Sequence, residues 1–253
     1  MTETEEARAP SGGPADALVI AGLVPMSTVD WPDHLSATVF TQGCPWNCFY
    51  CHNQALIPTR TPGVVAWQEV RDLLRRRRGL LDGVVFTGGE ALRQDALADA
   101  AREVIDMGFA VGLHTAGPYP RRLHDMVERG LVDWVGLDIK ALPEHYAQVV
   151  GRPNSAPKAW QCLQVLLEAA ADGGPDFEVR TTVVPGDVTA DDAVEVARRA
   201  HETGARVYAL QQVRARGTSG TFPVVAPGWD ARCERMAAEI EAMGWERFTY
   251  RPA

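Results

Sequence analysis

Three of the five cysteines lie within eight residues, as Cys44, Cys48 and Cys51 in a C-x3-C-x2-C loop that also contains Pro45 and Asn47. Three thiolates at this spacing can surround one compact metal centre. A cubane iron–sulfur cluster has four irons, so three cysteines leave one iron open to another ligand, whereas an electron-transfer cluster normally has a fourth cysteine. The loop therefore favours a [4Fe–4S] cluster with one open iron.

Three alternatives remain open for this loop. The run CFYCH at 48–52 matches the C-x-x-C-H signature of c-type haem attachment, but such haem normally belongs to exported proteins and leaves Cys44 unexplained. Structural zinc through the three cysteines and His52 has suitable ligand types, yet adjacent Cys and His ligands rarely reach tetrahedral geometry. Unligated thiols in such a loop would be open to oxidation. Cys162 and Cys233 stand alone in helix-like segments, where we expect buried, inert thiols.

Polar residues at the ends of later strand-like runs are further candidates for a ligand site. The run 88–90 is Gly-Gly-Glu, in which paired glycines let a ligand approach the backbone and a carboxylate can receive an ammonium group. Thr115 ends another such run. Asp138 and Lys140 alternate with period two, so they share one face of their strand. A salt bridge at the rim is an equally good interpretation of that last pair.

The elements that must position these residues alternate regularly along the chain. Apolar, β-branched runs predict six strands, and helix-period segments with glycines at their C-terminal ends lie between them. The expected strands are 36–42, 83–89, 109–115, 134–140, 177–184 and 206–213. The expected helices are 66–78, 95–107, 119–129, 156–171, 190–203 and 230–243.

Such alternation indicates an α/β fold with parallel strands and right-handed helical crossovers, either an open doubly wound sheet or a full or partial (β/α) barrel. In both architectures the reactive residues lie at the C-terminal ends of the strands. The candidate residues above follow such ends.

Composition narrows the function classes. The formal charge of −8 and a pI near 5.3 argue against a nucleic-acid binder, which needs a basic face. Residues 1–17 are acidic and rich in Pro, Gly and Ala, so we expect a disordered leader followed by a single domain over 18–253. We see neither a secretory signal nor an apolar run long enough for a membrane span, so we expect a cytoplasmic protein.

At this point the residues resemble a known superfamily. The three-cysteine loop with an aromatic residue before its last cysteine, followed by Gly-Gly-Glu, resembles radical S-adenosylmethionine (SAM) enzymes. More narrowly, STVDWP at 27–32, TQGCPWNCFYCHN at 41–53 and FTGGE at 86–90 resemble activating proteins of anaerobic ribonucleoside-triphosphate reductase, which are relatives of pyruvate formate-lyase activating enzymes. The likeness runs from about residue 23 to 216, leaving a C-terminal extension.

The resemblance implies a partial (β/α)6 TIM-like barrel that binds a [4Fe–4S] cluster and SAM. It also implies a glycyl-radical enzyme as partner and a flavodoxin- or ferredoxin-type reductant. A small-molecule enzyme similar to 7-carboxy-7-deazaguanine synthase remains an alternative, as does an electron carrier with an iron–sulfur or haem centre. The implied cluster ligands are Cys44, Cys48 and Cys51, and the implied SAM-binding residues are Tyr50, Gly88, Gly89, Glu90, Thr115, Asp138, Lys140 and Val184.

Overall fold

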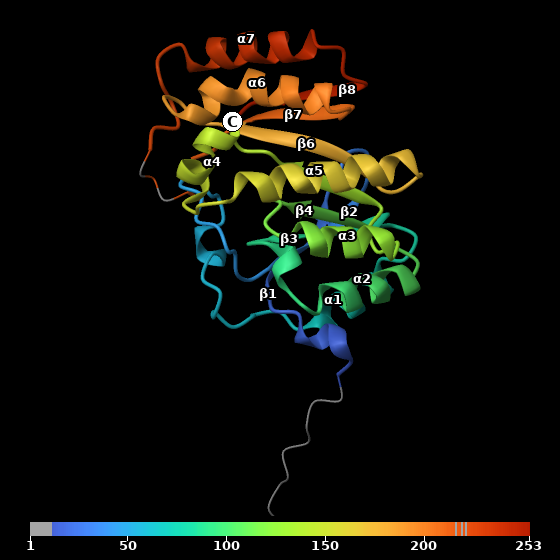
Figure 1. Cartoon of the computed structure of the whole chain (residues 1–253). Coiled ribbons are helices and arrows are strands. Elements are labelled where there is room, and N and C mark those ends of the chain that lie inside the picture. The colour runs from blue at the N-terminus through green and yellow to red at the C-terminus, as the bar shows by residue number, and fades with distance from the viewer. Residues whose placement is uncertain (1–11, 216, 219, 221) are drawn as a thin grey trace, which may run out of the picture.

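An eight-stranded sheet runs through the computed structural model of the protein, which describes residues 12–215, 217, 218, 220 and 222–253 (Figure 1). The strands lie side by side in chain order. Pairings from β2 through β8 are all parallel, and β1 is antiparallel to β2. The strands are β1 (Ile20–Ser27), β2 (Ser36–Thr41), β3 (Gly83–Gly88), β4 (Ala110–Thr115), β5 (Trp134–Asp138), β6 (Asp176–Val183), β7 (Val207–Gln212) and β8 (Arg247–Arg251).

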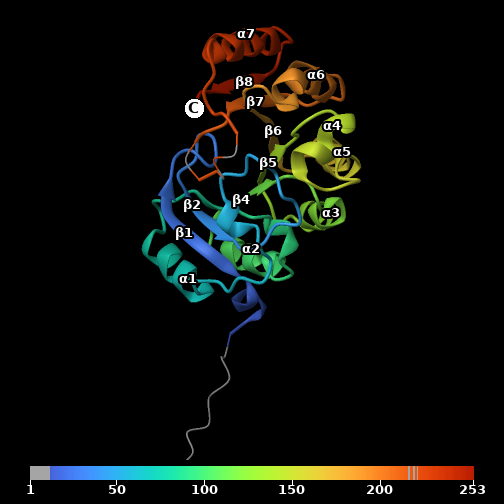
Figure 2. The same cartoon turned by 90° about the vertical axis from the view of Figure 1, so that its left-hand side faces the viewer.

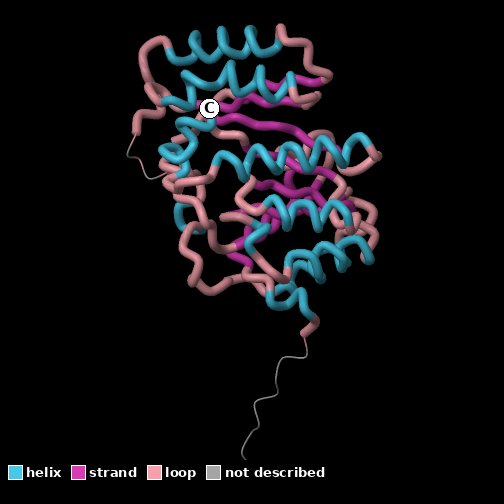
Figure 3. Tube along the Cα trace, in the orientation of Figure 1, coloured by secondary structure: helices cyan, strands magenta, loops and turns pink. Residues whose placement is uncertain are grey.

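Helices cover one face of this sheet. In Figure 2, α3 to α6 lie together beside the strands, and in Figure 3 the helices stand in front of them. We call the opposite face of the sheet its inner face. The helices are α1 (Trp67–Arg76), α2 (Leu97–Asp106), α3 (Pro120–Glu128), α4 (Pro143–Val150), α5 (Ala156–Ala171), α6 (Val188–Glu202) and α7 (Trp229–Glu241), with 3-10 turns η1 (Pro14–Ala17), η2 (Gln54–Leu56) and η3 (Ala91–Arg93).

The alternation of strands and helices confirms the six predicted strands and six predicted helices, each within a few residues. The local signals are visible in the structure. The Asp187 carboxylate accepts the amide of Thr189 at the start of α6, and the glycine that follows α2, Gly108, has a left-handed φ of 88°. Two strands and one helix were not predicted, β1, β8 and α4. β1 contains Gly22 and Pro25, which weaken a strand signal, and α4 is only eight residues long.

The N-terminal leader was expected to extend through residue 17, and that boundary is wrong. Residues 14–17 form η1, in which Ala15 is fully buried and Asp16 pairs with Arg71 of α1 at 2.7 Å. Packing against α1 and α2 orders this short segment although its own composition does not favour structure. Residues 1–11 lie outside the described part of the chain.

The loop between β1 and β2 folds onto the inner face of the sheet. Its Trp31 is buried and stacks on Trp134 of β5, with ring centroids 5.7 Å apart. A Cβ atom on Gly112 of β4 would lie 2.8 Å from the Trp31 ring, so the glycine makes room for the indole. This loop therefore closes one end of the barrel interior.

The sheet is not closed on itself. Among the described strands, β1 pairs only with β2 and β8 only with β7, so the two edges lie at opposite ends of the sheet. This open arrangement is the predicted partial barrel with two additional edge strands. The extension after about residue 216 contributes α7 and β8. None of the described helices combines the length and apolarity that would be needed to span a membrane.

Candidate functional site

The cysteine loop leaves the C-terminal end of β2 and is held by its own hydrogen bonds. The Gln42 side-chain amide donates to the carbonyls of Ala55, at 3.2 Å, and Pro58, at 2.8 Å. The Cys44 amide donates to the Ile57 carbonyl at 3.1 Å. The side chain of Gln42, the residue directly after β2, therefore connects the beginning of the loop to its end.

Burial controls the chemistry of the three thiols in the loop. Cys48 is buried, and Cys44 and Cys51 are half-buried. Removal from water raises the pKa of the Cys44 thiol to about 12 and that of Cys48 to about 11, because it penalises the thiolate. Without a metal the Cys44 and Cys48 thiols stay protonated, and direct coordination would hold them as thiolates. The loop is therefore suited to ligation rather than to nucleophilic attack.

The paired glycines at the end of β3 bring that strand against the cysteine loop. Gly88 has a φ of 117°, and a Cβ atom there would lie 2.3 Å from the Thr41 amide nitrogen. A Cβ atom on Gly89 would lie 2.5 Å from the Gly43 carbonyl oxygen. Glycine is thus required at both positions because the backbone at the end of β2 and the start of the cysteine loop packs directly against them, whether or not a ligand is bound.

Glu90 is a buried carboxylate with hydrogen-bond donors but no basic partner among the described residues. Thr115 Oγ1 donates to Oε1 at 2.9 Å, the Ala116 amide donates to Oε2 at 3.1 Å, and the Leu92 amide donates to Oε1 at 3.1 Å. Burial raises the pKa of Glu90 to about 7 despite these donors. A cationic ligand group beside Glu90 would supply the missing counter-charge.

Asp138 and Lys140 share an ion-pair network with a residue that the sequence analysis did not select. Lys140 Nζ lies 3.1 Å from Asp138 Oδ2, and Arg180 Nε of β6 lies 3.0 Å from Asp138 Oδ1. Burial raises the pKa of Asp138, but the two basic neighbours outweigh it and hold that pKa at about 2. Two nearly buried cations thus share one carboxylate, which leaves a positive charge facing the cavity.

A cavity of about 680 Å³ brings the predicted residues together at the C-terminal ends of the strands. Val184 is the exception, because it is buried and does not line the cavity. Its backbone N–H donates a hydrogen bond to Thr189 Oγ1 at 3.0 Å. The role expected for Val184 stays a prediction. The predicted residues that line the cavity are Cys44, Cys48, Tyr50, Cys51, Gly88, Gly89, Glu90, Thr115, Asp138 and Lys140.

Sequence analysis missed several inner-face residues of the same cavity. His114 of β4 is within 2.6 Å of the Asp30 carbonyl oxygen through Nε2, and burial together with Arg180 lowers its pKa to about 3, so the ring is neutral. Period-two alternation could have found others, since charged or polar residues at every second position face one side of a strand. The missed lining residues include Arg180 and Thr182 of β6, Gln211 of β7, and Arg247, Thr249 and Arg251 of β8.

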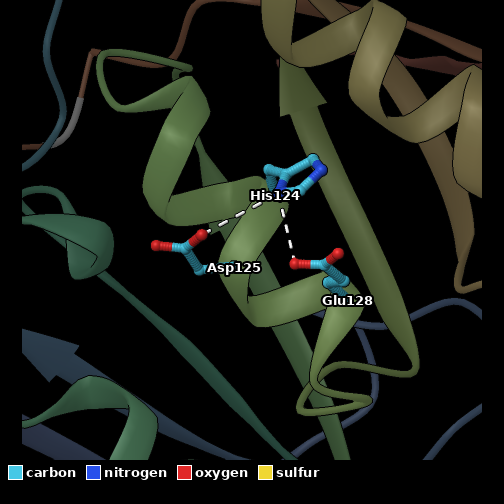
Figure 4. A group of neighbouring side chains, drawn as sticks. All are labelled: His124, Asp125 and Glu128. Carbon is cyan, nitrogen blue, oxygen red and sulfur yellow. Dashed lines mark ion pairs between the residues drawn. The ribbon is translucent and has the colours of Figure 1, made fainter.

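A group of three potential metal ligands lies elsewhere, on the surface of α3. Among the described residues, His124, Asp125 and Glu128 on α3 have ligand atoms within 4.8 Å of one another (Figure 4). All three are exposed, and the His124 ring lies 3.7 Å from the Glu128 carboxylate, as neighbours one helical turn apart often do. Cys44, Cys48 and Cys51 do not form such a group, because at least two of their sulfurs lie more than 4.8 Å apart.

The cavity fits a cluster with a SAM molecule beside it. Three separated thiols can each take a different iron of a cubane, and none of the described residues supplies a fourth cysteine to the cavity. Glu90 offers an anionic cradle for an ammonium group. The Tyr50 hydroxyl is buried without a hydrogen-bond partner among the described residues, and its ring lies 5.4 Å from Lys140 Nζ. In the cavity that the cysteines line, the Tyr50 hydroxyl therefore lacks a hydrogen-bond partner and Glu90 lacks a counter-charge.

Comparison with known proteins agrees with this geometry. The sequence pattern of the family described as Radical SAM superfamily matches residues 38–200, which is more than half of the chain. A Methanocaldococcus jannaschii protein named as a glycyl-radical enzyme activating enzyme is 27% identical over 195 residues, covering 77% of this chain and 79% of the relative. The pyruvate formate-lyase-activating enzyme of Clostridium pasteurianum is 28% identical over 180 residues, covering 69% and 71% of the two chains.

Solved structures share the fold. The crystal structure of Streptococcus suis SuiB bound to S-adenosylmethionine superposes with a TM-score of 0.63 at 10% sequence identity. The match covers 84% of this chain and 48% of SuiB, so this chain spans about half the length of that protein. At this identity the likeness shows the fold alone.

Proposed function

This chain belongs to the radical SAM superfamily, and from that membership we propose that it is an activating enzyme which generates a glycyl radical on anaerobic ribonucleoside-triphosphate reductase. One observation carries the proposal. The cysteine loop and the Gly-Gly-Glu turn are joined by hydrogen bonds around one cavity, with the Glu90 amide donating to the Gly43 carbonyl at 3.0 Å. The glycyl-radical activating names of the relatives support the reaction class.

When bound, the [4Fe–4S] cluster and SAM supply a 5′-deoxyadenosyl radical that removes a hydrogen atom from the substrate. The protein contributes binding, orientation and exclusion of water. In our proposal Cys44, Cys48 and Cys51 hold the cluster. Glu90, with the glycines before it, receives the methionine ammonium group of SAM. The remaining SAM contacts in the proposal are Tyr50 and the backbone at Val184 for the adenine, and Thr115, Asp138 and Lys140 for the carboxylate and ribose.

The match to the radical SAM superfamily also bears on the alternative of c-type haem attachment. The matched residues include Cys44 together with Cys48 and Cys51, whereas haem attachment would leave Cys44 unused. The finer parts of the proposal are the reductase as partner, a flavodoxin- or ferredoxin-type protein as electron donor, and the cytoplasm as the place of action. A target glycine is chemically suitable because the radical on its α-carbon is stabilised by the neighbouring amides.

The test begins with anaerobic reconstitution of the full chain with iron and sulfide, followed by dithionite reduction in the presence of SAM. We expect the wild type to form 5′-deoxyadenosine and Cys48→Ala to form none. Cys162→Ala is the matched control, because that thiol is fully buried away from the cavity lining and should not affect turnover.

The second stage adds anaerobic ribonucleoside-triphosphate reductase and records the electron paramagnetic resonance spectrum. A glycyl radical doublet that requires SAM and Cys48 supports the proposal. SAM cleavage without a radical on the reductase would reject the named partner, and turnover of a small molecule would then favour the other branch of the superfamily. No SAM cleavage by fully clustered protein would reject the enzyme function itself.

A further inference from the structure

Three exposed aliphatic side chains gather on β1 and the loop that follows it. Val24 is 37% exposed, Met26 52% and Val29 80%, and they lie within six residues of one another. The other large hydrophobic residues exposed on the described surface are Val64, whose amide donates to Ile20 at the start of β1, and Leu80 and Val225. A single exposed aliphatic residue needs no explanation, whereas several adjacent ones suggest a contact surface.

Val24 and Val29 border the open side of the partial barrel, and Met26 lies between them in the chain. Val24 pairs directly with Thr38 of β2, and opposed residues of an antiparallel pair project from the same face. Thr38 Oγ1 donates to the Asp30 carboxylate at 2.7 Å, and Asp30 lines the cavity, so this is the inner face. A closed barrel would cover that face, but here β1 has no strand beyond it among the described residues.

The surface is continuous with the cavity that contains the cysteines. Val29 is both the most exposed of the three aliphatic residues and part of the cavity lining. At the other edge of the sheet, β8 directs Arg247, Thr249 and Arg251 into the same cavity. Both arginines are already paired, Arg247 with Asp33 and Arg251 with Glu178. The open side is therefore bordered by an apolar edge on β1 and by a polar, hydrogen-bonding edge on β8.

The exposed edge of β1 is poorly suited to adding another strand. Pro25 has no amide hydrogen to donate, and the pairing of β1 with β2 shifts register between Val24 and Ser27. A partner would consequently bind through side-chain packing and not through a continued backbone ladder.

We propose that Val24, Met26 and Val29, here called the β1 lip, are the docking surface for the glycyl-radical enzyme whose glycine enters the cavity. The inference rests on the proposed function. A protein substrate can reach the cysteines only with the chain on either side of its glycine in contact with the cavity border. The partner segment that fits has apolar side chains toward the β1 lip and uncharged hydrogen-bonding groups, such as backbone carbonyls, toward the polar edge of β8.

The experiment measures activation of anaerobic ribonucleoside-triphosphate reductase by the reconstituted holoenzyme. Val24→Glu and Met26→Glu place a charge on the lip without altering a cavity-lining residue, and Leu80→Glu is the control, since Leu80 is 49% exposed and lies far along the chain, before β3. We expect each lip variant to raise the KM for the reductase about tenfold or more. Partner-independent formation of 5′-deoxyadenosine and the KM for SAM should match the wild type, and the control should match it in every assay.

Other outcomes separate the two proposals. Lip variants that activate the reductase with a wild-type KM would overturn the docking surface while leaving the proposed function intact. A wild type that cleaves SAM but makes no radical on the reductase would overturn the named partner and this occupant of the lip together. If sedimentation shows a wild-type dimer that Met26→Glu converts to a monomer, the lip belongs to a second copy of the chain and the proposal is wrong. If a glutamate variant fails to bind the cluster, the same assays are made with Met26→Ser, which removes the apolar side chain without adding a charge.

Discussion

Glu90 should make SAM binding depend on pH in a direction that the structure determines. Burial raises the pKa of this carboxyl to about 7 in the enzyme without SAM. Only the ionised form can pair with the ammonium group of SAM, so the affinity should fall as the pH is lowered through 7. The ionised fraction is about 9% at pH 6.0 and about 76% at pH 7.5, which predicts an affinity about eightfold lower at pH 6.0.

The measurement is the Kd of SAM for the reconstituted, unreduced holoenzyme by anaerobic equilibrium dialysis from pH 6.0 to 7.5. The ordinary pKa of an α-amino group is about 7.7–8.0, so most of the ligand is cationic over this range, and its partial deprotonation at pH 7.5 reduces the expected change in Kd to about five- to sixfold. Glu90→Gln cannot ionise, and we expect it to bind SAM at least about tenfold more weakly at pH 7.5, equivalent to about 1.4 kcal/mol, with a flat pH profile.

Glu195→Gln is the control because Glu195 is exposed on α6 and pairs with Arg198 and Arg199. It should reproduce the wild-type pH profile. A wild-type Kd that is constant over this range would refute the assignment of Glu90 as the counter-charge of the ammonium group. So would a Glu90→Gln variant that keeps the pH dependence.

Two further predictions concern groups that hold the cavity together. Gly88→Ala should prevent cluster assembly, measured by iron content and visible absorbance, because its Cβ would lie 2.3 Å from the Thr41 nitrogen. Gly79→Ala is the control, because it carries a similar left-handed strain at a φ of 77° but has no atom within 4 Å of the added Cβ, and it should assemble the cluster normally. Asp138→Asn should lower the free energy of unfolding in urea by about 3 kcal/mol, because it leaves two buried cations without their carboxylate. We use the low end of the range because 27% of the Asp138 side chain is exposed, and Asp95→Asn, at an exposed ion pair, should change stability by less than about 1 kcal/mol. Wild-type behaviour of Gly88→Ala or Asp138→Asn would contradict the packing described for each.

The local sequence determined most of the elements and the chemistry of the cysteine loop. Six strands and six helices could be predicted because apolar period and helix-ending glycines are signals within short windows. The three cysteines and the Gly-Gly-Glu turn were informative for the same reason, since spacing along the chain sets which ligands can meet. β1 escaped prediction because its glycine and proline weaken the only signal that sequence offers for an edge strand.

Only the tertiary structure decided which distant residues share the cavity. Arg180 pairs with Asp138 across 42 residues, and Arg251 reaches the same cavity from the last strand. No local pattern specifies such contacts, because they depend on the order of strands in the sheet and on which face each strand turns inward. The open side between β1 and β8 is likewise a property of the whole sheet. The sequence alone thus predicted which residues form the reactive centre, and the packing of the chain determined which other residues surround them.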